Sequence, residues 1–209
     1  MGGYIKWTFW IVVVACVAAF LSYVLPQRDI VRITGTEIIR TDFTGWNRIF
    51  YAQADSGSSA EPTRDLRLIN TARPGGGVMV YRNEDTGLFW PPYFKFDSSD
   101  LQAEAQSLIS SPDAPKWAVV LHYGWRIRYL TVYPNAITIR PIDDPDVRLI
   151  PWVNIAILTF LAALTWGIWV RVRRFKQRRI DPKLEALDDA IDERRAGLSR
   201  WIASWKRKG

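Results

Sequence analysis

The chain's only histidine is the first residue whose chemistry could support a reaction. His122 stands alone among 209 residues, so a Ser-His-Asp triad or a two-histidine metal site must use it or do without. It alternates with Leu121 and Tyr123 in a run that predicts a β-strand. An envelope enzyme would need a carboxylate or tyrosine pair in a cleft around it. We expect instead a strand histidine that faces solvent or bonds to a neighbour, and no catalytic residue.

Two other runs have compositions that occur in ligand sites, one polar and one of three glycines. The run 82–87 (Arg-Asn-Glu-Asp-Thr-Gly) predicts a hairpin loop whose side chains bond their own backbone. A calcium-like site there would need further oxygens, from Asp97 or Asp100. The run 75–77 has neither the spacing nor the Lys-Ser/Thr of a phosphate loop. One cysteine permits no internal disulfide and no multi-cysteine zinc site. We therefore predict no metal and no cofactor.

The run 88–96 is rich in aromatic residues and contains two consecutive prolines. Prolines lack the donors of a central strand, so we expect a loop. It either folds over the domain core or forms a contact surface for a partner or for the membrane interface, where aromatic rings are favoured. The residues assigned to this contact are Phe89, Trp90, Tyr93, Phe94, Trp125 and Arg126.

Two apolar segments flank the part of the chain that contains all of these candidate residues. Residues 7–25 carry no charge, and neither do residues 151–170. A helix of about 19 residues spans ~28 Å, close to the hydrocarbon thickness of a bilayer. Aromatic residues lie near the ends of both segments, as is typical of membrane interfaces. We predict two transmembrane helices, which excludes both a simple cytosolic globule and a many-pass transporter.

The first apolar segment has a second interpretation. Residues 13–16 resemble a bacterial lipoprotein box, in which Cys16 would carry the lipid after cleavage. Apolar residues continue for nine positions beyond Cys16, whereas a mature lipoprotein usually begins with polar ones. The transmembrane interpretation is therefore preferred.

Charge predicts the orientation of the two helices. Residues 1–6 contain Lys6, and the tail 171–209 carries a net charge of +7, whereas residues 26–150 carry −1. By the positive-inside rule both ends are cytoplasmic and the domain 26–150 lies outside the cytoplasm. Six cations are assigned to lipid headgroups, although topology alone would account for them: Arg171, Arg173, Arg174, Lys176, Arg178 and Arg179.

The domain 26–150 reads as α+β, a mainly antiparallel sheet with one short helix. Strands are predicted over 30–40 with a bulge at Gly35, over 65–70 and 78–82 around a turn at 74–77, and over 117–123, 125–133 and 136–140. The helix is predicted from Asp97 or Ser98 to Ile109. Residues 54–60 predict a mobile loop. Short connections at 26–28 and 143–146 would hold the domain close to the membrane.

The tail is predicted to contain an amphipathic helix after Asp181 and Pro182. Apolar residues recur there at helical spacing, and tryptophans and cations follow near the end. We expect the tail helix to dock on the membrane surface or on a partner. No motif supports a nucleic-acid role.

Five stretches carry a resemblance to a known family: 23–29, 81–86, 90–96, 123–127 and 133–136. Through them the chain resembles domain-of-unknown-function family 1523, whose members are proteobacterial membrane proteins. The resemblance implies a bacterial inner-membrane location and a periplasmic domain, and it carries over no catalytic residue. We expect a non-enzymatic accessory, scaffold or assembly component of a membrane complex, with an integral-membrane partner or a second copy of the chain. The alternatives are a periplasmic ligand sensor, with an apolar pocket in the sheet, and an envelope enzyme.

Overall fold

The computed structural model describes residues 2–42, 63–88, 91–183, 187, 189 and 191–197. The chain divides into two compact units, Met1–Asn154 and Ile155–Gly209, which are treated separately below. The predicted mobile loop 54–60 lies outside the described residues, as do Phe89, Trp90 and much of the predicted tail helix.

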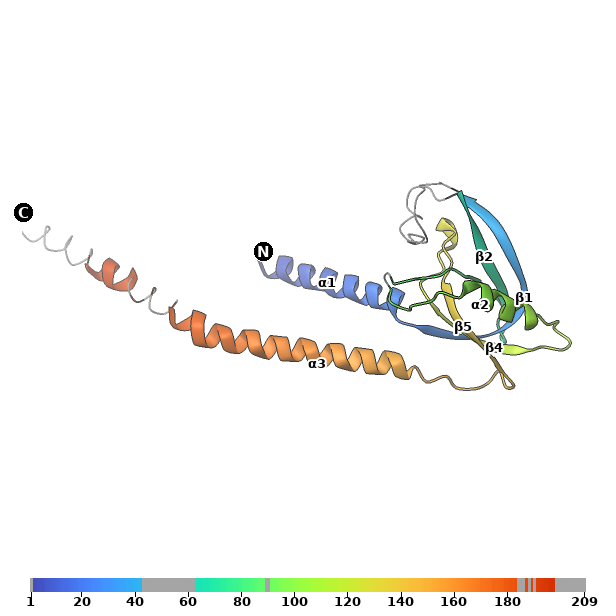
Figure 1. Ribbon diagram of the computed structural model, residues 1–209. Helices are drawn as coiled ribbons and strands as arrows, with labels where there is room; N and C mark the ends of the chain where they lie inside the picture. Colours follow the sequence, from blue (N-terminus) through green and yellow to red (C-terminus); the bar gives the residue numbers. More distant parts are fainter. Residues whose placement is uncertain are drawn as a thin grey trace, which may run out of the picture. The chain divides into compact units, whose positions relative to one another are not determined.

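The first unit is a five-stranded barrel preceded by a long helix (Figure 1). Helix α1 (Gly2–Val24) leads into β1 (Gln27–Asp42), followed by β2 (Thr63–Ala72), β3 (Val78–Arg82), α2 (Ser98–Ser107), β4 (Trp117–Tyr123) and β5 (Asn135–Ile142). The α+β class, the short helix and most strand positions were therefore predicted correctly.

Strand β1 allows the sheet to close because it pairs on both sides. Its first part, from Gln27 to Arg32, pairs with β4, and its later part, to Asp42, pairs with β2. The register of the β1–β2 pair shifts between Ile33 and Gly35, which confirms the predicted bulge. The strand order is β1-β2-β3-β5-β4 in a closed barrel. This order, with a helix between β3 and β4, is that of the OB-fold.

Closure also requires one parallel contact, which the sequence did not predict. Strands β3 and β5 meet in parallel through Arg82 and Asn135, whereas the other paired strands are antiparallel. The sheet is therefore mixed and has no open pair of edges among the described strands.

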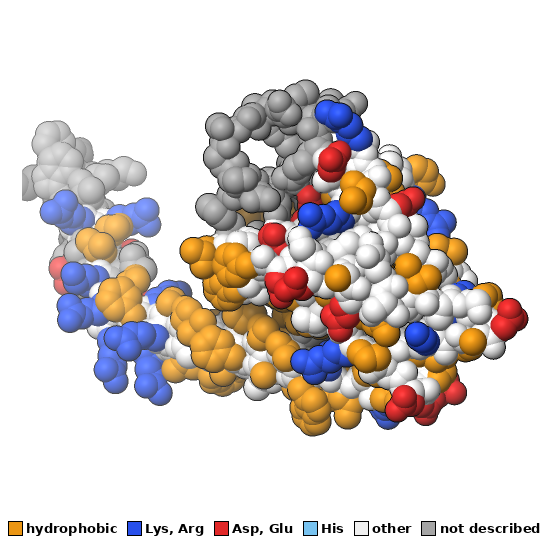
Figure 2. All heavy atoms as spheres, turned by 45° about the vertical axis from the view of Figure 1, so that its right-hand side comes forward, with side chains coloured by type: hydrophobic (Ala, Val, Ile, Leu, Met, Phe, Trp, Pro, Cys, Tyr) orange, Lys and Arg blue, Asp and Glu red, His pale blue; other side chains and the backbone are white. Residues whose placement is uncertain are grey.

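The core fills the barrel interior. Val31, Ile33, Tyr81 and Val120 are fully buried there, and Leu101 and Ala105 of α2 pack against them. Burial alternates along β4 because successive side chains point to opposite faces. A smaller cluster forms on another side of β2 and consists of Leu66, Leu68 and Val132. On the surface seen in Figure 2, acidic and basic side chains of the barrel are interspersed, in keeping with the near-neutral charge of this domain.

The predicted strand over 125–133 is wrong. A 3₁₀ turn at Arg128–Leu130 interrupts it, and Thr131 adopts a φ of +50°. Only an isolated bridge joins Ile127 to Val132. The alternating apolar residues arise from a tight hairpin instead, so Tyr129 is fully exposed while Ile127 is half-buried.

Two long apolar helices lie in the described part of the chain, α1 and α3 (Trp152–Phe175). Both are long and apolar enough to cross a membrane, and neither apolar window is buried within the protein. They suggest a two-pass membrane protein. Cys16 lies exposed on α1.

Two hydrogen bonds inside the first unit join the residues around the start of α3 to those around the start of β1. The side-chain amide of Asn154 donates to the carbonyl of Pro26 at 2.9 Å, and Arg28 donates to the carbonyl of Ile150 at 3.3 Å. These bonds hold residues 150–154 next to the start of β1.

Candidate functional site at the junction of α1 and the barrel

The C-terminal end of α1 is capped by groups of the barrel and its first strand. A helix leaves its last four carbonyls without partners inside the helix, apart from bonds that tighten the last turn. Here the N–H of Leu25 reaches Leu21 at 2.8 Å, and the side chain of Gln27 reaches Ser22 at 3.0 Å. The two remaining acceptors receive bonds from distant residues. Gly124 donates its N–H to Tyr23 at 2.9 Å, and the Tyr93 hydroxyl donates to Val24.

Aromatic rings surround these hydrogen bonds. Tyr23 makes edge contacts with Trp125 at 5.3 Å and with Tyr123 at 6.2 Å between ring centroids. Tyr93 stacks on Tyr123 at 4.8 Å with an interplanar angle of 15°. The Trp125 indole also donates to the Ser22 hydroxyl at 3.3 Å. Such contacts contribute beyond simple area burial, so the last turn of α1 is packed as part of the barrel.

A buried ion pair lies beneath the aromatic rings. Arg82 is 3% exposed and pairs with Glu84 at 3.1 Å, and its guanidinium also interacts with Tyr23. Asn135 exchanges hydrogen bonds of 3.0 Å with the backbone N–H and C=O of Glu84, and it donates to the Tyr123 hydroxyl at 3.3 Å. Arg82 and Asn135, which form the parallel contact between β3 and β5, therefore both contact residues of the junction with α1.

Lys95 anchors the aromatic loop from inside. Its ammonium donates to the Asn83 side chain and to the carbonyl of Ala136 at 2.7 Å. Burial lowers the pKa of Lys95 to about 7, although the carboxylates of Asp85, Asp97 and Glu84 act in the opposite direction. Burying an amino group without hydrogen-bond acceptors would cost free energy. Because Asn83 and Ala136 supply acceptors, the Lys95 side chain can hold the loop in place.

The polar run 82–87 makes contacts different from those predicted. Asn83 donates to the carbonyl of Ser98 and to the Gln102 side chain, both at 2.7 Å. Asp85 accepts the N–H of Ser98 at 2.8 Å. These side chains therefore bond the loop to α2 rather than to their own backbone. No group of three or more His, Cys, Asp or Glu side chains among the described residues is placed to hold a metal ion.

A second polar cluster surrounds Asp29 on the barrel wall. Its Oδ2 accepts hydrogen bonds from Tyr81 at 2.6 Å and Arg73 at 2.9 Å, and it lies 3.3 Å from His122 Nε2. Partial burial alone would raise the pKa of Asp29, but the donors His122, Tyr81 and Arg73 outweigh it and hold the pKa well below its usual range. Burial, together with the Asp29 charge, raises the pKa of Tyr81.

This cluster brings a carboxylate and a tyrosine to His122, the combination that an enzyme would need. His122 is only 2% exposed, and its ring lies 5.0 Å from that of Tyr81. The histidine thus lies at ion-pair distance from the Asp29 carboxylate, and it does not face solvent, as one of the two expectations had it. Both ring nitrogens, Nδ1 and Nε2, are buried, and neither has a partner in hydrogen-bond geometry among the residues that the structure describes.

The residues assigned to a contact surface divide into two groups. Tyr93 and Trp125 face α1, as described above, and Arg126 lies 4.2 Å above the Tyr133 ring and donates to the Val132 carbonyl at 2.9 Å. Phe94 instead faces outward, with 57% of its surface exposed and a φ of +51°.

Two further apolar residues of this loop are exposed and were not assigned. They are Leu88, at 77%, and Phe96, at 62%. The assigned Phe89 and Trp90 lie outside the described residues. In an extended segment, side chains two residues apart point to the same side. This alternation could have identified Phe96 as exposed, like Phe94.

The six basic residues assigned to lipid headgroups lie in the second unit. Arg171, Arg173 and Arg174 belong to the last turns of α3, and the other three, Lys176, Arg178 and Arg179, belong to a π-helical turn at Lys176–Ile180. All six side chains are exposed.

All five stretches that carry the family resemblance contribute to the junction. They supply Tyr23 and Gln27, Arg82 and Asn83, Tyr93 and Lys95, Tyr123 to Trp125, and Pro134 and Asn135. Segments far apart in the sequence thus meet where α1 joins the barrel, and this makes the junction the candidate functional site.

Comparison with known proteins supports the resemblance. The chain matches the family described as protein of unknown function (DUF1523) over residues 4–176. A protein of Haemophilus influenzae (strain ATCC 51907 / DSM 11121 / KW20 / Rd), described as an uncharacterized protein, is 41% identical over 143 residues, which cover 68% of this chain and 77% of that protein. No solved structure matches the chain.

Proposed function

The chain belongs to the DUF1523 family, and we propose that it is a non-enzymatic, two-pass protein of the bacterial inner membrane. Its barrel lies on the periplasmic side, both termini are cytoplasmic, and the protein serves as an accessory, scaffold or assembly component of a membrane complex. The partner is an integral-membrane protein or a second copy of the chain.

The observation that carries this proposal is the capping of α1 by the barrel. Because Gly124 and Tyr93 bond the last carbonyls of α1, the barrel holds one orientation relative to that helix. A domain on a flexible stalk would sample many orientations. A fixed domain presents the same surface to a neighbour in the membrane, as a scaffold must.

The loop above the junction supplies the contact surface in this proposal. Leu88, Phe94 and Phe96 are exposed apolar side chains on one loop, and Tyr93 of the same loop bonds to the end of α1. Exposed apolar residues that lie close together are typical of protein contacts. Their place beside the membrane boundary favours an integral-membrane partner.

Two features favour this function over the alternatives. A ligand sensor would need an apolar pocket in the barrel, whereas Val31, Tyr81 and Val120 fill the barrel interior. An envelope enzyme would need access to His122, which is 2% exposed.

Photo-crosslinking in the native membrane tests the proposal. The full chain carries p-benzoylphenylalanine at position 94 or, as a control, at position 78. Val78 is 72% exposed and lies at the opposite end of β3 from the junction. We expect an adduct with an integral-membrane protein or with a second copy from position 94 and none from position 78. Recovery of an uncrosslinked monomer from position 94 would refute the scaffold function.

Protease protection of tags at the two termini tests the topology separately. Both tags should be protected in spheroplasts and cleaved in inverted vesicles. A periplasmic C-terminus would contradict the two-pass arrangement.

A further inference from the structure

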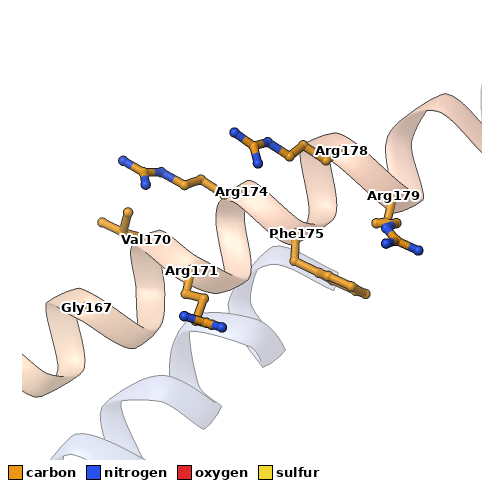
Figure 3. A pocket seen from close by; sticks show the side chains of 7 residues that line it. All are labelled: Gly167, Val170, Arg171, Arg174, Phe175, Arg178 and Arg179. Carbon is orange, nitrogen blue, oxygen red and sulfur yellow. The ribbon is translucent and has the colours of Figure 1, made fainter.

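Two rows of side chains border a groove along the basic end of α3. Figure 3 shows Val170, Arg174 and Arg178 pointing to one side of the helix, whereas Arg171, Phe175 and Arg179 point to another. Members of each row are four residues apart, so the rows are adjacent i, i+4 ridges of the helix surface. Gly167 lines the same groove at its apolar end.

The groove is cationic at one end and apolar at the other. Four arginines line it, and no residue from 149 to 180 is acidic. Guanidinium groups form paired hydrogen bonds with phosphate oxygens more readily than ammonium groups do. At the other end a Cβ added to Gly167 would meet no atom within 4 Å, so space lies open beside the backbone.

Arg173 shows that the groove differs from the rest of the basic segment. Its guanidinium lies over the ring of Trp169 at 5.3 Å. It is absent from the groove lining, as is Lys176. The basic residues therefore separate into a group that faces the groove and a group that does not.

Helix length places the two ends of the groove at different depths of a bilayer. From Trp152 to Arg171 the helix rises ~28 Å, about the thickness of the hydrocarbon layer. If α3 spans the membrane, Gly167 and Val170 lie among acyl chains and Arg171 reaches the phosphate layer. The order of apolar and cationic groups along the groove is then that of acyl chain and headgroup in a phospholipid.

We propose that this groove is a binding site for one anionic phospholipid, whose phosphate is held by Arg171, Arg174 and Arg178 and whose acyl chain lies against Gly167. The inference rests on the proposed two-pass topology and goes beyond it. The positive-inside rule needs only the number of charges, whereas a lipid site needs these charges in these positions.

Lipid retention by the full chain tests the site. The protein is placed in nanodiscs that contain equal amounts of phosphatidylglycerol and phosphatidylcholine, and the lipids that remain bound are counted by native mass spectrometry. We expect one phosphatidylglycerol per chain. The groove variant R171Q/R174Q/R178Q should bind at least tenfold less, while the matched variant R173Q/K176Q/K183Q, which loses the same charge, should change less than twofold.

A second pair of variants leaves the charge unchanged. Gly167→Leu fills the apolar end of the groove and should reduce retention at least threefold, whereas Ala162→Leu, which lies outside the groove lining, should not. Equal loss in both charge variants, or no preference for phosphatidylglycerol, would overturn the proposal in favour of diffuse attraction. Tags at the termini of the same variants, tested in spheroplasts and inverted vesicles, report topology. An α3 that does not span overturns both proposals, and a spanning α3 with equal losses overturns the lipid site alone.

Discussion

The main-chain N–H of Gly124 donates a hydrogen bond of 2.9 Å to the carbonyl of Tyr23. This bond links the end of β4 to the last turn of α1 across about a hundred residues of sequence. Gly124 has a φ of +92°, a conformation that glycine adopts far more readily than other residues. Glycine is therefore the residue best suited to position 124. The backbone conformation at this position places the N–H that caps α1.

Replacing Gly124 by alanine should lower the free energy of unfolding by about 1–2 kcal/mol, the cost of a left-handed backbone in an L-residue. The new Cβ would lie 3.5 Å from the Tyr23 ring and 3.6 Å from Pro134 Cα, which are ordinary contacts, so the cost is conformational. Denaturant unfolding in detergent measures it. The control Gly35→Ala has open space and no positive φ, and an equal loss there would contradict this explanation.

Asp29→Asn should destabilise the barrel by about 1–3 kcal/mol at pH 7, because Arg73, Tyr81 and His122 lose a charged acceptor. The pKa of Asp29 is depressed in the folded state. Its stabilisation is therefore present above the unfolded pKa and is lost as the pH falls through the folded one.

Urea unfolding between pH 7 and pH 2 checks this expectation. The wild-type chain should lose stability below about pH 4, and Asp29→Asn should lose less over the same range. Asp113→Asn, at an exposed loop position, serves as the control. If Asp29→Asn kept the full acid dependence, the depressed pKa would not be the cause.

Lys95 predicts a rise of stability with pH as well, but in a higher pH range. Its folded-state pKa of about 7 lies below the usual lysine value of 10.5, so the unfolded chain binds more protons between these values. Stability should therefore rise from pH 7 to pH 9, by at most about 1.4 kcal/mol per pH unit. Lys95→Met should remove this rise, and Lys116→Met, at an exposed position, should preserve it. A rise that persisted in Lys95→Met would exclude Lys95 as its origin.

Tyr93→Phe removes the hydroxyl that caps Val24 and should lower the free energy of unfolding by about 0.5–1.5 kcal/mol. The ring remains, so its stacking on Tyr123 should survive. Thermal unfolding in detergent gives the stability, and crosslinking from position 94 should stay unchanged. A loss of crosslinking with unaltered stability would show that the Tyr93 hydroxyl belongs to the contact surface instead.

Local signals made much of the fold predictable. The apolar segments, the bulge at Gly35, the turn at 74–77 and the helix from Ser98 each depend on neighbouring residues, and each is present in the structure. Closure of the barrel depends on pairs such as Gln27 with His122 and Arg82 with Asn135. Nothing in the local sequence specifies those partners, so the sheet was predicted and the barrel was not.

The candidate site, like the fold, was predictable only where local sequence determines it. The composition of the run 88–96 identified the loop, but not which side chains turn inward. Tyr93 turns inward because Val24 offers a carbonyl, and Lys95 because Asn83 and Ala136 offer acceptors. These acceptors come from other elements, and only the folded arrangement brings them to the loop.

Phe94→Asn should separate contact from stability. Phe94 has a φ of +51° and an exposed ring, and asparagine tolerates this backbone conformation better than phenylalanine does. We expect the free energy of unfolding to stay the same or to rise by up to about 1 kcal/mol. Co-purification of the partner in mild detergent should fall at least fivefold. Unchanged co-purification with a folded variant would remove Phe94 from the contact surface, whereas a large loss of stability would show that its ring packs within the protein.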